Sequence, residues 1–182
     1  MIVAPKHNPH ISWNTTPEEE ALCFPCDRHA VGYAGTYYRA ISIQAPPSRI
    51  YRWLLQMRLA PYSYDWINHL GRQSPRRLAT DAVPLAKGQS MMIIFDVIEF
   101  EENRSITLKV RPHSFWEWLF GGILLSYLIL PRGESCRMIV KIHRSFRRSP
   151  LGVFMKYFLP WANLIMHRKQ LHLFKQLAEA GR

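Results

Sequence analysis

The side chains of this sequence that could do acid-base chemistry are a carboxylate and an imidazole, each placed among aromatic residues. Asp65 lies between Tyr64 and Trp66, with Tyr62 close before them. Burial among aromatic rings raises the pKa of a carboxyl group towards the range that a general acid or base needs. The alternative, which we favour, is a structural role for Asp65 as a helix cap or as a partner of Arg72. In either case we expect the three aromatic side chains to line the mouth of a pocket.

His113 is the second candidate for chemistry. It precedes Trp116 and Trp118 in a segment that looks like a loop leading into a strand. A single polar group within an aromatic wall is the usual composition of a small-molecule site. Core packing beside a surface histidine explains the same residues equally well. Asp65 and His113 are therefore candidates only, and neither is assigned a catalytic role.

Cys23 and Cys26 have the C-x-x-C spacing of metal and redox sites. A zinc site needs two further ligands at a suitable spacing, and the nearby His7, His10 and His29 are scattered. We therefore expect no metal and no cofactor. The sequence contains no H-E-x-x-H and no G-x-S-x-G motif, so nothing supports a metalloprotease or a hydrolase with a nucleophile elbow.

Length and composition indicate one globular domain. The chain has 182 residues, of which 48% are hydrophobic and 20% charged. Its formal charge of +11 favours anionic partners such as nucleic acid, acidic proteins or lipid headgroups. The beginning of the chain lacks an apolar run behind basic residues, so we expect a cytoplasmic location. The most apolar stretch, residues 115–130, is shorter than the roughly 20 residues of a membrane span, and we expect it to be buried.

The first part of the chain is expected to differ from the rest. Residues 1–35 are rich in Pro, His, Asn and Gly and show no periodicity, so they are predicted to form an extended or partly ordered arm. Residues 36–182 are predicted to form the domain. It begins with a strand at 36–44, which Pro46 and Pro47 end. A helix should follow, because the apolar residues recur at helical spacing on one face. These residues are Ile50, Trp53, Leu54 and Met57.

The middle of the chain is strand-rich. Residues 91–100 form a long apolar run, Asn103 is a suitable turn residue, and residues 105–110 alternate so that one face should be buried. Residues 124–130 and 136–143 are predicted to form a hairpin with its basic face in solvent. The basic side chains of its second strand are Arg137, Lys141 and His143.

A long helix is predicted from Pro150 to about Ala180, with a kink or break at Pro160, since proline removes a backbone hydrogen bond. One apolar stripe of this helix should face the sheet. The stripe consists of Phe154, Tyr157, Phe158, Trp161 and Ile165, extended by Leu171, Phe174 and Leu177.

Three motifs carry a resemblance to a known family. The segments IQAPPSRIYRWL (residues 43–54), YSYDWINHLGR (62–72) and Lys87-Gly88 resemble bacterial members of the START-like superfamily, also called SRPBCC or polyketide-cyclase-like proteins. The resemblance covers roughly residues 30–178. It implies an α+β helix-grip fold, in which a curved antiparallel sheet wraps around a long C-terminal helix, with two short helices after the first strand. It also implies a deep cavity for lipids, polyketides or other apolar molecules. Gln89 and Asn68-His69 depart from the residues usual at those positions.

We therefore expect a protein that binds or transports a hydrophobic small molecule, and favour this over an enzyme. A polyketide cyclase or dehydratase that uses the same pocket is one alternative. A basic surface module for an anionic membrane or nucleic acid is the other. The membrane is favoured because a lipid carrier must approach one to load, and nucleic acid is disfavoured because the apolar stripes look committed to a core. The residues expected to contact the ligand are Trp53, Tyr62, Tyr64, Asp65, Trp66, Arg72, Phe95, Trp116, Trp118, Phe154, Tyr157, Phe158, Trp161 and Ile165.

Overall fold

The computed structural model describes residues 8, 10–58, 84–146 and 150–180. The strands are β1 (Ser12–Trp13), β2 (Gly35–Ile43), β3 (Ser90–Met91), β4 (Phe95–Glu101), β5 (Ser105–Val110), β6 (Ile123–Arg132) and β7 (Ser135–Arg144). The α-helices are α1 (Pro17–Glu20), α2 (Pro47–Leu55), α4 (Phe115–Phe120) and α5 (Pro150–Ala180), and the 3-10 helices are η1 (Pro25–His29) and η2 (Gln56–Arg58).

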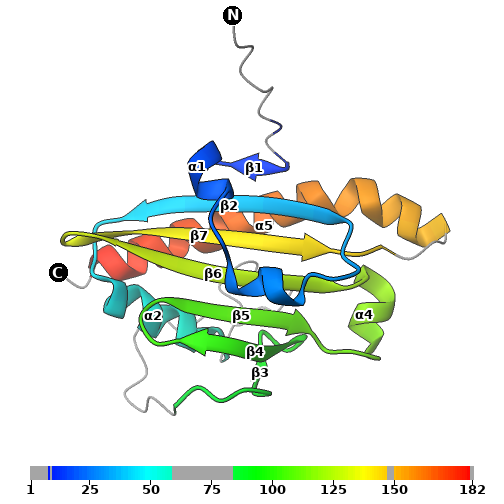
Figure 1. Ribbon diagram of the computed structural model, residues 1–182, viewed down its shortest axis with the longest axis horizontal. Coiled ribbons are helices and arrows are strands. Elements are labelled where there is room, and N and C mark those ends of the chain that lie inside the picture. Colours follow the sequence, from blue (N-terminus) through cyan, green and yellow to red (C-terminus); the bar gives the residue numbers. More distant parts are fainter. Residues whose placement is uncertain (1–7, 9, 59–83, 147–149, 181–182) are drawn as a thin grey trace, which may run out of the picture.

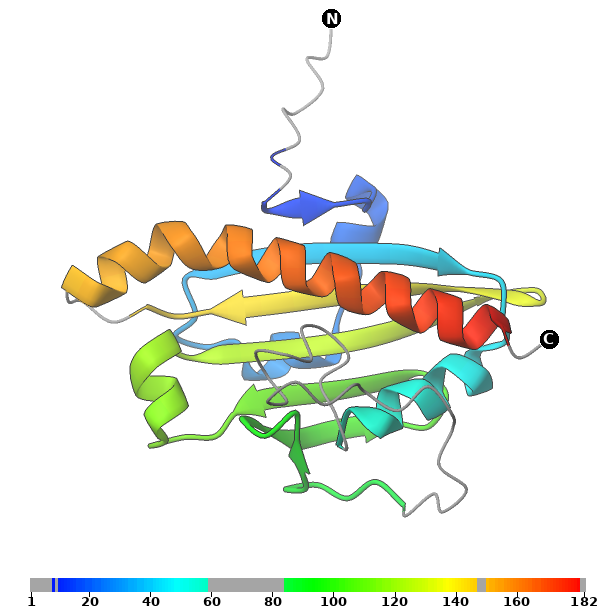
Figure 2. The same cartoon turned by 180° about the vertical axis from the view of Figure 1, so that it is seen from behind.

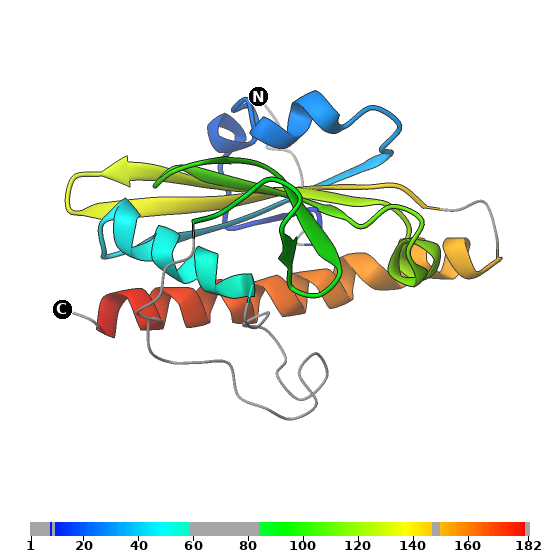
Figure 3. The ribbon, with the colours of Figure 1, turned by 90° about the horizontal axis from the view of Figure 1, so that it is seen from below.

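The strands form one sheet that curves around the long helix (Figures 1 and 2). Its order is β1-β2-β7-β6-β5-β4-β3. Only the β1–β2 pair is parallel among the strand pairs of the described residues. Helices α2 and α5 cover one face of the sheet, and the N-terminal elements α1 and η1 cover the other (Figure 3). This is the α+β helix-grip arrangement, as predicted from the sequence.

The predicted first strand and first helix are confirmed. Pro47 occupies the start of α2, where its missing N–H costs nothing, and Pro46 precedes it as the N-cap. The predicted apolar stripe, Ile50, Trp53, Leu54 and Met57, is buried. The inward side chains of the sheet pack on α2 and on the second half of α5, where Leu171, Phe174 and Ala178 are fully buried.

The apolar run at 91–100 is not one strand. Met92 and Ile93 have φ angles of 50° and 70°, and the chain turns there between β3 and β4. The prediction of a continuous strand over residues 91–100 was wrong. Met92 and Ile93 are apolar residues that give no sequence signal of a turn. The turn predicted at Asn103 is confirmed, with a φ of 58°.

The outer face of the sheet is buried at β5 and β7, and the predictions of a single buried face at 105–110 and of a solvated basic face on β7 were wrong. Ser105 and Thr107 of β5 are buried, as are the basic side chains of β7. Arg137, Lys141 and His143 are each only 8% exposed. The alternation of residues along a strand distinguishes the two faces of a sheet. It does not show that a distant segment covers the outward face and buries its side chains.

That covering layer is the N-terminal segment, and two carboxylates fasten it to β7. Glu19 accepts a hydrogen bond from Arg137 Nε at 2.9 Å. Asp27 lies 2.7 Å from Lys141 Nζ and 2.9 Å from His143 Nε2. Burial by itself would raise the pKa of Asp27, but hydrogen bonds from Lys141, the Phe24 N–H and His143 together lower it. The segment predicted as an extended or partly ordered arm thus contains β1, α1 and η1, which are too short for periodicity to show in the sequence.

Helix α5 runs unbroken through Pro160, so the predicted break is absent. The stripe predicted to face the sheet is also misassigned. Its first half points to solvent, whereas Leu159, Leu164 and His167 of the opposite side are buried. The N-terminal half of α5 is apolar nearly all round, so its sequence does not reveal which side packs. The first turns extend past the ends of the strands (Figure 2).

Replacing Phe174 by alanine tests which side of α5 packs on the sheet. We expect Phe174→Ala to lower the free energy of unfolding by about 3–5 kcal/mol, because a fully buried ring leaves a cavity. The matched control is Phe154→Ala on the same helix. Phe154 is 59% exposed, so this substitution should lower the free energy of unfolding by less than about 1 kcal/mol. Urea denaturation of both variants gives the comparison. Equal losses would contradict this packing of α5.

Candidate ligand-binding site

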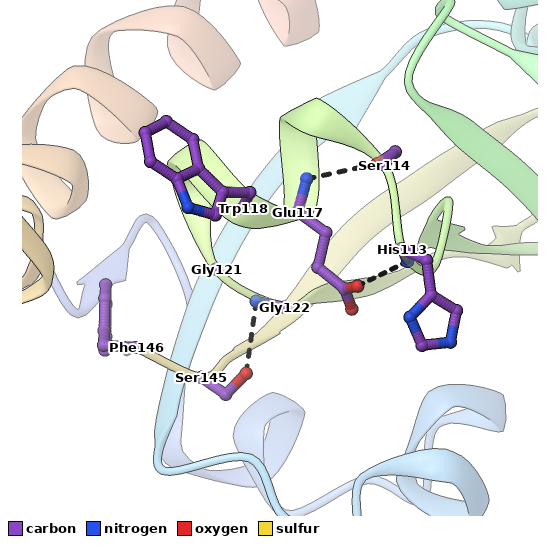
Figure 4. A pocket seen from close by; sticks show the side chains of 8 residues that line it. All are labelled: His113, Ser114, Glu117, Trp118, Gly121, Gly122, Ser145 and Phe146. Atoms are coloured by element: carbon purple, nitrogen blue, oxygen red, sulfur yellow. Dashed lines mark hydrogen bonds between the residues drawn. The ribbon is translucent and has the colours of Figure 1, made fainter. Parts of the chain in front are cut away.

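A pocket of about 500 Å³ lies at one end of the sheet, between α4 and the segment that leaves β7 (Figure 4). Its lining consists of His113, Ser114, Glu117, Trp118, Gly121, Gly122, Ser145 and Phe146.

The wall of the pocket is helix α4, and this corrects the prediction of a loop leading into a strand around His113. Ser114 is the N-cap: its hydroxyl oxygen accepts from the Glu117 N–H at 3.2 Å. The Glu117 carboxylate in turn accepts from the His113 backbone N–H at 2.8 Å (Figure 4). Gly121 ends the helix with a φ of 74°. The apolar stretch 115–130 is therefore divided into an exposed helix and the buried strand β6, rather than buried throughout.

The floor of the pocket depends on two glycines that approach Ser145 closely. Gly122 N–H donates to Ser145 Oγ at 3.2 Å, and Ser145 N–H donates to Gly122 O at 2.9 Å (Figure 4). A Cβ at Gly121 would lie 2.1 Å from the Ser145 carbonyl oxygen, and one at Gly122 would lie 2.5 Å from Ser145 Oγ. Only glycine fits at position 121, where the close atom belongs to the backbone and φ is positive, whereas a side chain at 122 would require Ser145 to shift. The close approach at Gly121 brings α4 against the end of β7.

The structure brings together some of the predicted site residues. His113 and Trp118 line the pocket, whereas Trp116 lies outside the lining and stacks on Phe120 with ring centroids 5.9 Å apart. Trp53 and Phe95 are buried in the core that faces α5.

The other predicted contacts are not in this pocket. Phe154, Tyr157, Phe158, Trp161 and Ile165 lie on the exposed side of α5. Tyr62, Tyr64, Asp65, Trp66 and Arg72 lie outside the described residues, so their roles remain predictions.

A second polar group of residues lies between the sheet and α5, and it was not predicted. Tyr127 of β6 donates to Gln170 Oε1 of α5 at 2.8 Å, with both side chains buried. Burial, with Arg39 and Arg144 nearby, lowers the pKa of His167 to about 4, so this imidazole is neutral at physiological pH. The sequence could have predicted the position of Arg39. Alternate residues of a strand share a face, so Arg39 lies on the same inward face as Ile41 and Ile43.

A third cluster, Cys26, Asp27 and His143, has potential metal-ligand atoms within 4.8 Å of one another. Burial raises the pKa of the Cys26 thiol to about 11, which disfavours the thiolate that a metal requires. The Lys141 ammonium already lies against Asp27, and Cys23, the other half of the C-x-x-C motif, is exposed. This cluster is best explained as the fastening of the N-terminal segment.

No known protein family model matches this chain, and no curated protein does so either. Solved structures do match. A protein from Mesorhizobium loti is 13% identical with a TM-score of 0.53, over 81% of this chain and 98% of that one. Protein TTHA0849 from Thermus thermophilus is 16% identical with a TM-score of 0.52, over 80% and 98%.

The di-domain ARO/CYC StfQ from the steffimycin biosynthetic pathway is 12% identical with a TM-score of 0.51. It matches 86% of this chain, which spans 55% of the di-domain protein. At these identities the likeness establishes the fold alone. The chain has the START-like helix-grip fold, as the sequence motifs predicted.

Placing a methyl group on the pocket floor tests its construction. Gly121 combines its φ of 74° with a ψ of -176°, a region that essentially only glycine occupies. We expect Gly121→Ala to lower the free energy of unfolding by about 3 kcal/mol or more, from backbone strain plus the overlap with Ser145. Gly133→Ala is the control, because its φ is also positive (59°) but nothing lies within 4 Å of the added carbon. Thermal melts in which both variants lose the same stability would contradict the close approach.

Proposed function

We propose that this chain binds an apolar, lipid-like or polyketide-like small molecule between the sheet and α5, and carries it rather than transforming it. The observation that supports this most is a set of large apolar side chains left exposed on α4, which forms the wall of the pocket, and on α5. We call this set the aromatic end. It comprises Phe115, Trp116 and Trp118 of α4 and Val153, Phe154, Tyr157, Phe158, Trp161 and Ile165 of α5.

The part of the aromatic end on α4 and on the first turns of α5 lies at one end of the molecule. Helix α4 and the start of α5 lie at the same end of the sheet in opposite views (Figures 1 and 2) and in the view from below (Figure 3). The exposure of these side chains ranges from 37% for Trp116 to 70% for Tyr157. Single exposed apolar residues are ordinary, but a grouping of this size signals an apolar partner. Burying one such side chain contributes about 1.5–3 kcal/mol, so a ligand or acyl chains that cover several would bind with useful affinity.

The charge around the aromatic end suits an anionic membrane surface as the place of loading. Lys156, Arg168 and Lys169 are exposed on α5, and the whole chain carries a formal charge of +11. Tryptophan and tyrosine rings are favoured at the membrane–water interface, and basic residues are attracted to anionic headgroups. In the described residues no helix has the length and hydropathy needed to cross a bilayer. The exposed rings and the exposed basic side chains are the grounds on which we propose contact at the membrane surface.

A cyclase-like or dehydratase-like enzyme is the second candidate, and one observation favours it. His113 lines the pocket with a φ of 57°, a conformation that non-glycine residues adopt sparingly and often at functional sites. Histidine tolerates this conformation better than most residues, so the carrier remains the better proposal. An enzyme would lose turnover without loss of binding in His113→Gln.

Native mass spectrometry of the purified protein, beside its denatured mass and an organic extract, tests the proposed function. We expect a bound apolar molecule that dissociates on denaturation and is recovered in the extract. A protein that is empty after purification and binds none of a panel of fatty acids, sterols and aromatic polyketides would refute the carrier proposal.

Removing rings from the aromatic end tests its contact with membranes. In Tyr157→Ser/Phe158→Ser we expect binding to vesicles of phosphatidylserine and phosphatidylcholine to weaken roughly tenfold or more, because two apolar anchors are lost. The melting temperature should not fall, since both side chains are mostly exposed. The control is Val31→Ser, at a 94% exposed valine of the N-terminal segment.

Binding of the same variants to a single-stranded DNA oligonucleotide should be measured in parallel. The exposure of these rings removes the argument that the apolar stripes are committed to a core, which had disfavoured nucleic acid. Equal loss of binding to single-stranded DNA, with vesicle binding unchanged, would overturn the membrane assignment.

A further inference from the structure

Two arginines are buried at the junction of the sheet and α5 without a carboxylate partner in the described part of the chain. Arg39 of β2 is 0% exposed and Arg144 of β7 is 2% exposed. All ion pairs between described residues involve other arginines, lysines or histidines. A buried cation without a counter-charge is costly, and proteins normally pair it.

Arg39 is largely committed to the N-terminal segment. Its Nη1 donates to Ile11 O at 2.8 Å and Tyr38 O at 2.7 Å, and its Nη2 donates to His10 O at 2.8 Å. Its Nε is buried without a partner. These acceptors are neutral carbonyl oxygens, so the positive charge of Arg39 is hydrogen-bonded but not compensated.

The Arg144 guanidinium donates fewer hydrogen bonds to described residues than that of Arg39. Its one hydrogen bond to a described residue is from Nη2 to Phe120 O at 2.9 Å, although a guanidinium offers five N–H donors. Its Nε is also buried without a partner, and the Phe146 ring lies 5.5 Å from its Cζ. Phe120 immediately precedes the pocket floor at Gly121, and Phe146 is itself in the pocket lining. The Arg144 guanidinium therefore lies directly behind the pocket.

Among the residues that the structure describes, the neighbours of both arginines contribute no negative charge. Tyr37 lies between them on the inward face of β2, and burial raises the pKa of its hydroxyl, which stays neutral. Across from them on α5 is His167, also neutral, one helical turn from Asn163, whose buried Oδ1 has no partner. The interface between the sheet and α5 thus holds two arginines without a carboxylate partner among the described residues. It also holds buried polar atoms that make no hydrogen bond to those residues.

We propose that Arg144, assisted by Arg39, recognises the anionic head, a carboxylate or a phosphate monoester, of an amphipathic ligand whose apolar body lies between the sheet and α5. This inference rests on the proposed function and names the ligand class. A planar guanidinium presents paired N–H donors that match two oxygens of a carboxylate or phosphate. Such a ligand supplies the counter-charge that these two arginines lack among the described residues.

Titration of the protein with decanoate, decyl phosphate, 1-decanol and inorganic phosphate, followed by tryptophan fluorescence, tests this inference. We expect the wild type to bind at least one of the two charged decyl compounds roughly tenfold or more tightly than decanol, as charge-assisted hydrogen bonds require. Arg144→Met should abolish that preference while decanol still binds. Arg104→Met is the matched control, because Arg104 is an exposed arginine paired with Glu101 at the surface. It removes the same charge and should keep the preference.

The outcomes separate the two proposals. If no decyl compound binds, the proposed function fails. If decanol binds as tightly as both charged compounds, or if Arg144→Met keeps the preference, the ligand-class inference fails while the proposed function stands. Inorganic phosphate binding as tightly as decyl phosphate would show a free-anion site and overturn the amphipathic assignment.

A melting temperature for each variant completes the design. Arg144→Met removes an uncompensated buried charge, so its empty form should melt no lower than the wild type. If that variant does not fold, Arg144→Lys replaces it: the charge is kept but the paired N–H donors are lost, so the preference for anions should weaken and still persist, while Arg144→Gln should lose it. Loss in both, or in neither, would overturn the assignment to the charge of Arg144.

Discussion

The side of α5 that packs on the sheet determines most of what this structure can do. Leu171, Phe174 and Ala178 fasten the second half of the helix to the inward side chains of the strands. The first turns of the helix extend past the ends of the strands, and the aromatic side chains on the outer side of its first half face solvent. Because a helix is rigid over its length, the packing of the distal half sets the orientation of the proximal half. The aromatic end is thus a consequence of core packing far from it.

The other face of the sheet shows how ion pairs can substitute for hydrophobic contact. The side chains of Arg137, Lys141 and His143 point outward from β7. They contact the carboxylates of Glu19 and Asp27 in the N-terminal segment. These buried pairs specify where the segment lies more than they stabilise it, since desolvation offsets much of their attraction. The contrast with Arg39 and Arg144 is informative. On the outer face each buried cation of β7 has an acidic partner, whereas on the inner face these two have none among the described residues.

The pocket, the aromatic end and the buried arginines therefore share one explanation. The glycines at 121 and 122 bring α4 against the end of β7, which places the pocket beside Arg144. An amphipathic ligand would satisfy the positive charge inside and the apolar surface outside at the same time. The fold is shared with an ARO/CYC protein of a biosynthetic pathway and with bacterial proteins of low identity, so the fold alone does not choose between carrier and enzyme.

The strand that ends before Pro46, the helix that begins at Pro47, the hairpin of β6 and β7 and the extent of α5 were determined by the sequence, because each rests on local periodicity and on prolines or turn residues. His113 and Trp118 could likewise be selected as site residues by their types. Only the tertiary structure decided which side of α5 is exposed, that Arg137 and Lys141 are buried, and that Arg39 and Arg144 face inward with no acidic partner in the described part of the chain. The physical reason is common to all three: local pattern identifies the faces of an element, but a distant segment decides which of those faces water still reaches.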